Sequence, residues 1–135
     1  LDPLDGAVET LNWIRENIQI IILSDTFEEF VTPLMKKLGF PALLCHNLTI
    51  DAQGTITDYN IRIDNQKKRA VKALQSLNYQ VIGFGDSYND IGMIQQAEQG
   101  FFFKPPESVV KDYPDIPVTR TYDELKTMIT TMLNK

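Results

Sequence analysis

The sequence has 135 residues, of which 43% are hydrophobic and 23% charged, and its formal net charge is −5. This balance is that of a globular rather than a disordered chain, and the length suits one domain over residues 1–135. The negative charge argues against nucleic acid or an anionic membrane surface as the main partner. The longest apolar run, Ile18–Leu23 with Gln19 inside it, is far too short to span a bilayer.

The single cysteine and the first residue indicate the cellular compartment of the chain and whether it is part of a longer protein. The one cysteine, Cys45, excludes an internal disulfide and fits a reducing compartment, so we predict a cytoplasmic location. We expect Cys45 to be a small buried side chain rather than a nucleophile. Because the chain begins with Leu1 and a linker-like segment, we expect it to be part of a longer polypeptide.

Apolar periodicity predicts the elements of the first half of the chain. A helix starts near Asp5-Gly6 and is followed by IQIIIL, whose β-branched run is typical of a strand buried on both faces. A second helix over 27–38 restarts or kinks at Pro33 and ends at Gly39. Strands over 42–51 and 55–64 flank the turn DAQG, which predicts a β-hairpin.

The second half continues the alternation of helices and strands. The predicted elements are a helix over 66–77 with Leu77 on its buried face, a buried strand over 79–84, a helix over 89–98, a strand over 101–103, a short helical turn in KPPESVVKDYP, an edge strand over 118–120 and a final amphipathic helix. We therefore predict an α/β, Rossmann-like fold with a mostly parallel sheet, flanking helices and one hairpin.

Three polar features lie at one edge of this predicted sheet. Ser24-Asp25-Thr26 and the segment Asp86–Asp90 each follow a predicted strand, at the carboxyl edge where ligands bind in such sheets. The helix that opens with Lys67 starts at the same edge, and the spacing of its apolar residues turns Lys67 inward. An inward cation at a helix amino terminus indicates an anion, above all phosphate, and the Asp oxygens suit Mg²⁺.

Each feature has a simpler explanation when it is taken alone. Ser24 could cap the following helix, Ser87 and Asp90 resemble a capping box, and three basic residues in a row are usually a solvated face. The convergence of all three features favours a site for an anion and a metal.

These residues resemble a known family. IIILSDT, a lysine that opens the next crossover helix, and GFGDSYND resemble motifs two, three and four of the haloacid dehalogenase superfamily. The resemblance extends over nearly the whole chain and is strongest to the phosphoserine phosphatase/homoserine phosphotransferase type, which has Ser-Asp-Thr in motif two.

The resemblance implies roles for individual residues. By this resemblance Ser24, with Thr26 beside it, would hydrogen-bond the phosphoryl oxygens, and Lys67 would neutralise the phosphate and the charge on the nucleophile. Asp86 is a Mg²⁺ ligand, and Asn89 and Asp90 complete the surround of phosphate and metal. The implied reaction is in-line phosphoryl transfer from a small phosphorylated substrate to an Asp nucleophile, then to water or an acceptor alcohol.

One motif of the family is absent from residues 1–135. No segment matches the Asp motif of the first strand, which carries the nucleophile, so we expect the chain alone to be inactive and to be the C-terminal part of the core. In the family that strand lies between the strands of motifs two and four. We expect their edges to pair directly, to accept another segment, or to be covered in an oligomer.

Two other functions stay open at this point. One is a non-catalytic binding module of the same fold, and the other is an unrelated flavodoxin-like binder. The sequence leaves the substrate and the acceptor undetermined, and it assigns no role to His46 or Arg62 near the hairpin.

Overall fold

The computed structural model describes residues 3–62 and 64–134, and the chain divides into two compact units. Unit 1 is Leu1–Gln66 and unit 2 is Lys67–Lys135. The strands form two sheets of three, in the orders β1-β2-β3 and β4-β5-β6. The prediction of an α/β fold with mostly parallel pairing is confirmed, and the prediction of a single domain stays a prediction.

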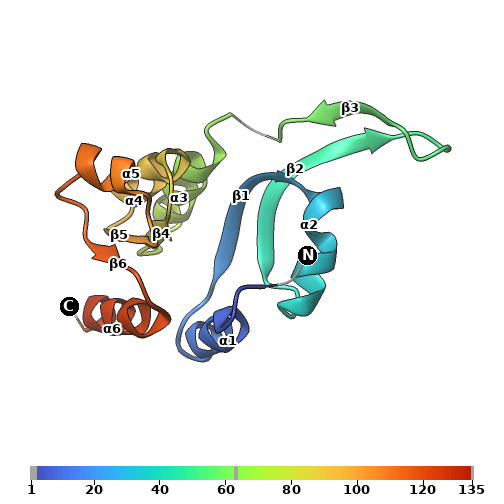
Figure 1. Cartoon of the computed structure of the whole chain (residues 1–135). Coiled ribbons are helices and arrows are strands. Elements are labelled where there is room, and N and C mark those ends of the chain that lie inside the picture. Colours follow the sequence, from blue (N-terminus) through green and yellow to red (C-terminus); the bar gives the residue numbers. More distant parts are fainter. Residues whose placement is uncertain (1–2, 63, 135) are drawn as a thin grey trace. The chain divides into compact units, whose positions relative to one another are not determined.

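Unit 1 consists of two helices, a three-stranded sheet and the first residue of a third helix (Figure 1). Its elements are α1 (Ala7–Asn17), β1 (Ile21–Phe27), α2 (Glu28–Lys37), β2 (Ala42–Ile50) and β3 (Ile56–Asn60). β1 pairs with β2 in parallel, β2 pairs with β3 as an antiparallel hairpin, and α2 packs on β1 and β2. The predicted hairpin is thus confirmed, but its second strand ends at Asn60 rather than at residue 64; residue 63 lies outside the described residues.

The strand β1 differs from its prediction. It extends through Phe27, so Ser24, Asp25 and Thr26 belong to the strand rather than to a loop after it. No residue of β1 is buried, and Ile21 is 39% exposed, so the prediction of a strand buried on both faces is wrong. Among the described residues β1 has a strand partner on one side alone. The prediction failed because a run of apolar residues does not indicate how many neighbouring strands will cover it.

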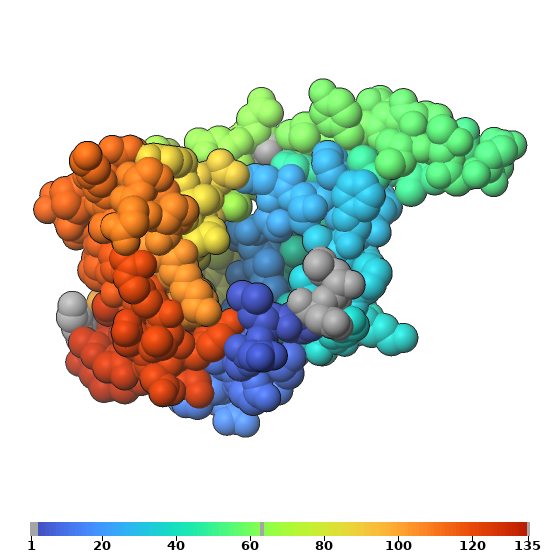
Figure 2. Space-filling view, viewed as in Figure 1, coloured from blue at the N-terminus to red at the C-terminus, as the bar shows by residue number. Residues whose placement is uncertain are grey.

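The hairpin of unit 1 has one apolar and one polar face. Leu48 and Ile50 pair with Tyr59 and Ile56, and these residues alternate along the strands with polar pairs. Ile50, Ile56 and Tyr59 are all exposed. In the space-filling view the tip of the hairpin projects from the rest of unit 1 (Figure 2).

Unit 2 contains a parallel sheet with its own core. Its elements are α3 (Gln66–Ser76), which begins at the last residue of unit 1, β4 (Ile82–Gly85), the 3₁₀ turn η1 (Tyr88–Asp90), α4 (Ile91–Gln96), β5 (Gln99–Phe103), α5 (Glu107–Asp112), β6 (Val118–Thr119) and α6 (Tyr122–Leu133). The pairings β4/β5 and β5/β6 are parallel. Phe101, Phe102, Val71 and Ile129 are almost completely buried.

Two details of unit 2 depart from the predictions. Leu77 is 68% exposed and follows the end of α3, so it does not belong to the buried face of the helix. Tyr79 is 61% exposed and precedes β4, which begins at Ile82. The turn through Asn78, whose φ is +69°, breaks the apolar pattern before the strand begins. Among the described residues no helix is long and apolar enough to cross a membrane.

Candidate functional site

The predicted site residues fall into two groups, one in each unit. Ser24 and Thr26 lie in unit 1, and Lys67, Asp86, Asn89 and Asp90 lie in unit 2. Each group is described within its own unit.

The first group lies in the irregular part of β1. The backbone N–H of Thr26 donates to the Ser24 Oγ over 3.2 Å, so the hydroxyl acts as an acceptor within the strand and keeps its own hydrogen to donate. The N-cap residue of α2 is Phe27, and no side chain caps this helix. The simpler explanation of Ser24 as a helix cap is therefore wrong.

Three residues to which the sequence assigned no role surround this group. Gln66 and His46 are buried, and both approach the carboxylate of Asp25, while Arg62 contacts each of them. The sequence offered one weak signal for this cluster, a histidine and an arginine placed near the hairpin. Gln66 gave no signal, because a glutamine at the start of a helix is usually solvated.

The second group is organised around an ion pair. Lys67 Nζ donates to Asp90 Oδ1 over 2.8 Å, and the two side chains are only 13% and 8% exposed. The inward orientation of Lys67 that its spacing predicted is thus confirmed. The anion that lies against the amine in this structure is the Asp90 carboxylate, which residue spacing alone did not indicate.

The other oxygen of Asp90 binds the backbone of the preceding loop. Asp90 Oδ2 accepts from the N–H of Asp86 over 2.9 Å and from the N–H of Ser87 over 3.1 Å, and the predicted capping box is present. Burial would raise the pKa of Asp90, but the hydrogen bond and charge of Lys67 and these two N–H groups outweigh it and lower the pKa. Asp90 is therefore an ionised carboxylate at neutral pH.

Gly85 allows the Asp90 carboxylate to approach the backbone. A Cβ added at Gly85 would lie 2.3 Å from the carboxyl carbon and from Oδ2 of Asp90, closer than real Cβ atoms approach any heavy atom. The Gly-Asp pair that ends β4 thus has a steric reason: the glycine leaves the space that the carboxylate occupies.

The chemistry of Asp86 fits a divalent cation as part of a larger set of ligands. Its side chain is exposed, and within the described parts of the chain no partner of its carboxylate is found. Mg²⁺ takes one or two carboxylates and fills its other positions with water and phosphate oxygens. In the described chain no group of three His, Cys, Asp or Glu residues is placed to hold a metal. Asp86 would therefore supply one ligand of such an ion, and the other ligands would have to come from elsewhere. Asn89 is exposed beside Asp86.

Cys45 lacks the character of a nucleophile. Burial raises the pKa of its thiol, the charges of Glu28 and Glu29 raise the pKa further, and the charge of Arg62 opposes them. At neutral pH the group is the protonated thiol, which is a poor nucleophile.

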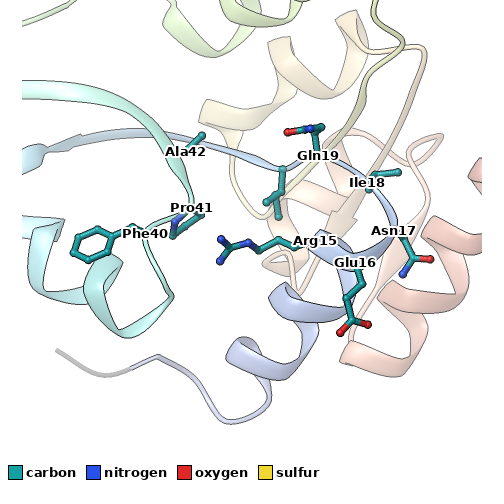
Figure 3. Close-up of a pocket in the computed structure, with 9 residues that line it drawn as sticks. Arg15, Glu16, Asn17, Ile18, Gln19, Phe40, Pro41 and Ala42 are labelled. Carbon is teal, nitrogen blue, oxygen red and sulfur yellow. The ribbon is translucent and has the colours of Figure 1, made fainter.

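A groove of about 470 Å³ lies elsewhere in unit 1, at the amino ends of β1 and β2 (Figure 3). Its lining comes from the end of α1 and the segments that lead into the two strands: Arg15, Glu16, Asn17, Ile18, Gln19, Ile20, Phe40, Pro41 and Ala42. None of the predicted site residues lines it. The guanidinium of Arg15 donates to the carbonyls of Leu38 and Gly39 at the end of α2, so it stabilises the helix terminus.

Comparison with known proteins gives consistent results. A family model described as haloacid dehalogenase-like hydrolase matches residues 1–98. The chain is 49% identical over 126 residues to phosphoserine phosphatase ThrH of Pseudomonas aeruginosa, an alignment that covers 93% of this chain and 62% of the relative. It is 48% identical to a phosphoserine phosphatase of Pseudomonas syringae pv. tomato, with 93% and 53% covered. The chain thus spans between half and two thirds of these relatives.

Solved structures support the fold. A substrate-bound phosphoserine phosphatase complex matches with a TM-score of 0.73 and 22% identity, covering 91% of this chain and 62% of the other. A phosphoserine phosphohydrolase-like protein from Francisella tularensis matches with a TM-score of 0.72 and 21% identity, covering 93% and 62%.

Proposed function

Because the chain belongs to the haloacid dehalogenase-like hydrolase family, we propose that it is part of an enzyme that transfers or hydrolyses the phosphoryl group of a small phosphomonoester of the phosphoserine type. The name of the relatives at 49% and 48% identity supports this substrate class. The observation that carries the proposal is the buried ion pair of Lys67 with Asp90, anchored to the loop that bears Asp86.

Each site residue has a role in this proposal. Ser24 and Thr26 donate to the phosphoryl oxygens, and Lys67, held in place by its ion pair with Asp90, neutralises their charge. Asp86 would be a ligand of Mg²⁺ and Asn89 would complete its surround; when bound, the ion supplies positive charge to the phosphoryl group. The phosphoryl group passes in line from the ester oxygen of the substrate to an Asp carboxylate, with release of the substrate alcohol, and then from that carboxylate to water or an acceptor alcohol. No residue among 1–135 matches the motif of that nucleophile, so this chain supplies the binding loops.

The test uses the full-length protein that carries this chain. We expect Asp86→Asn to lower kcat/KM for phosphoserine about 100-fold or more in the presence of Mg²⁺, and Ser24→Ala to lower it roughly tenfold to 100-fold, since each removes a group that stabilises transferred charge. Phosphate release measures both effects.

The control is Asp115→Asn, an exposed aspartate that follows α5 and should leave kcat/KM unchanged. Full activity of Asp86→Asn and Ser24→Ala would overturn the proposal and favour a binding module of the same fold.

A further inference from the structure

Gln66 is a completely buried polar side chain that contacts the strand of motif two. It is 1% exposed. Its Nε2 donates to the backbone carbonyl of Ser24 and to Asp25 Oδ1, the latter over 3.4 Å, and its Oε1 accepts from the Arg62 guanidinium over 2.7 Å. Glutamine is rarely buried to this degree, and all of its amide groups have partners here.

His46 approaches the same carboxylate from β2 and is 5% exposed. Its Nδ1 accepts the backbone N–H of Arg62 over 3.0 Å, so in the neutral ring the proton lies on Nε2. Nε2 lies 3.8 Å from Asp25 Oδ1. The contact with Arg62 therefore fixes the tautomer that directs an N–H toward Asp25.

These contacts meet where the pairing of β1 with β2 is irregular. Leu23 pairs with Leu44 and Phe27 with His46, so β1 advances four residues while β2 advances two. The additional residues, which include Ser24 and Asp25, lose regular ladder partners. The Gln66 amide binds the Ser24 carbonyl in place of a neighbouring strand.

We propose that Gln66 and His46 are positioning residues that hold the Ser24–Asp25 segment so that the Ser24 hydroxyl is presented to a phosphoryl group. Gln66 acts on the carbonyl of Ser24, and both residues act on the carboxylate of Asp25. The proposal rests on the proposed function, in which Ser24 binds the phosphoryl group. It extends that function to two side chains that do not touch the phosphate themselves.

The test is a double-mutant cycle on the full-length protein with inorganic phosphate as the probe. Gln66→Glu keeps the size of the side chain and the acceptor for Arg62, but it places a carboxylate oxygen against the Ser24 carbonyl. We expect the phosphate Kd to rise about tenfold in the wild-type background and less than about twofold in the Ser24→Ala background, because coupled residues are not additive. A purely structural effect would be the same in both backgrounds.

Gln75 provides a matched control on the same helix. It is a glutamine of α3 whose Nε2 also donates to a backbone carbonyl, that of Gln96. Gln75→Glu should leave the phosphate Kd unchanged in both backgrounds. If Gln66→Glu lowers the melting temperature so far that binding cannot be measured, Gln66→Met removes the same donor without adding a charge and is expected to give the same coupling.

Two variants of His46 separate its two contacts. His46→Gln keeps an N–H near the position of Nε2, and His46→Asn keeps an acceptor near the position of Nδ1. We expect His46→Gln to retain most of the phosphate affinity and His46→Asn to lose about as much as Gln66→Glu. Equal loss in both variants would overturn the role of His46 through Asp25.

The outcomes separate this inference from the proposed function. If Ser24→Ala alone leaves the phosphate Kd unchanged, the assignment of Ser24 and this inference fail together, while the proposed function is decided by the activities of Asp86→Asn and Ser24→Ala. If Ser24→Ala raises the Kd while Gln66→Glu has no effect or an equal effect in both backgrounds, the proposed function stands and the positioning role is overturned.

Discussion

The two carboxylate oxygens of Asp90 serve different partners. Oδ1 accepts from the amine of Lys67, and Oδ2 accepts from the backbone N–H groups of Asp86 and Ser87. One buried side chain thus fixes both the cation and the loop that follows β4. A buried pair of this kind is costly to break, because the remaining partner keeps its charge in a place that water reaches poorly.

Asp90→Asn should therefore lower the free energy of unfolding at pH 7 by about 2–4 kcal/mol. The pKa of Asp90 is lowered in the folded state, so its stabilisation is complete above the ordinary value of 3.8 and is lost as the pH falls through the folded pKa. Urea denaturation in metal-free buffer at a series of pH values measures this. A difference between wild type and variant that stays constant down to pH 2 would contradict the expectation.

At the residue scale the sequence predicts whether a side chain faces inward better than it predicts which residue that side chain contacts. The spacing of Lys67 from the apolar positions of its helix is enough to predict that its side chain faces inward. Its pairing with Asp90 depends on how α3 packs beside the loop after β4, which no local pattern contains. The contacts of Gln66 and His46 could not be predicted in this way. Their partners in β1 are far away in the sequence, and no local sequence pattern predicts the irregular pairing of β1 with β2.

The helix α2 forms although it contains a proline, a residue that usually interrupts helices. The sequence predicts that Pro33 restarts or kinks this helix; the helix continues through Pro33 from Glu28 to Lys37 without a restart. Pro33 removes one N–H from the helix ladder, which destabilises the helix, and its side chain is exposed. At the end of α2, Gly39 has φ +77°, and the N–H of Phe40 donates to the Met35 carbonyl over 2.8 Å, as the predicted glycine terminus requires.

Pro33→Ala should raise the free energy of unfolding by about 1–3 kcal/mol, because alanine restores the missing donor and favours the helix. Gly39→Ala should lower it by about 1 kcal/mol, because its positive φ strains an alanine and the new Cβ would lie 3.1 Å from the Arg15 guanidinium. Chemical denaturation measures both changes. A stabilising Gly39→Ala would show that the helix end relaxes.

For the whole molecule, the family resemblance predicted more than the hydrophobic pattern did. Apolar runs located most of the strands, but they described Ile18–Leu23 and Tyr79–Phe84 as buried, and the structure leaves Ile21 and Tyr79 exposed. Among the described residues, β1 and β4, the strands of motifs two and four, are assigned to different sheets. The pattern could not reveal this, because strand pairing depends on segments outside any local window.

We expect the 135-residue chain by itself not to turn over phosphoserine or p-nitrophenyl phosphate with Mg²⁺, since no segment of it resembles the family's nucleophile motif. Phosphate together with Mg²⁺ should still raise its melting temperature, because a ligand that binds the folded state stabilises it. Measurable turnover by this chain would contradict the first expectation. An unchanged melting temperature would contradict the second.

The two-faced hairpin of unit 1 has a practical consequence for handling the protein. Excluded salts such as ammonium sulfate strengthen the tendency of apolar surface to leave water, and the exposed side chains of Ile50, Ile56 and Tyr59 present such surface on the hairpin. Retention of the protein on a phenyl resin should therefore depend on this hairpin. We expect the variant Ile56→Ser to elute earlier than the wild type.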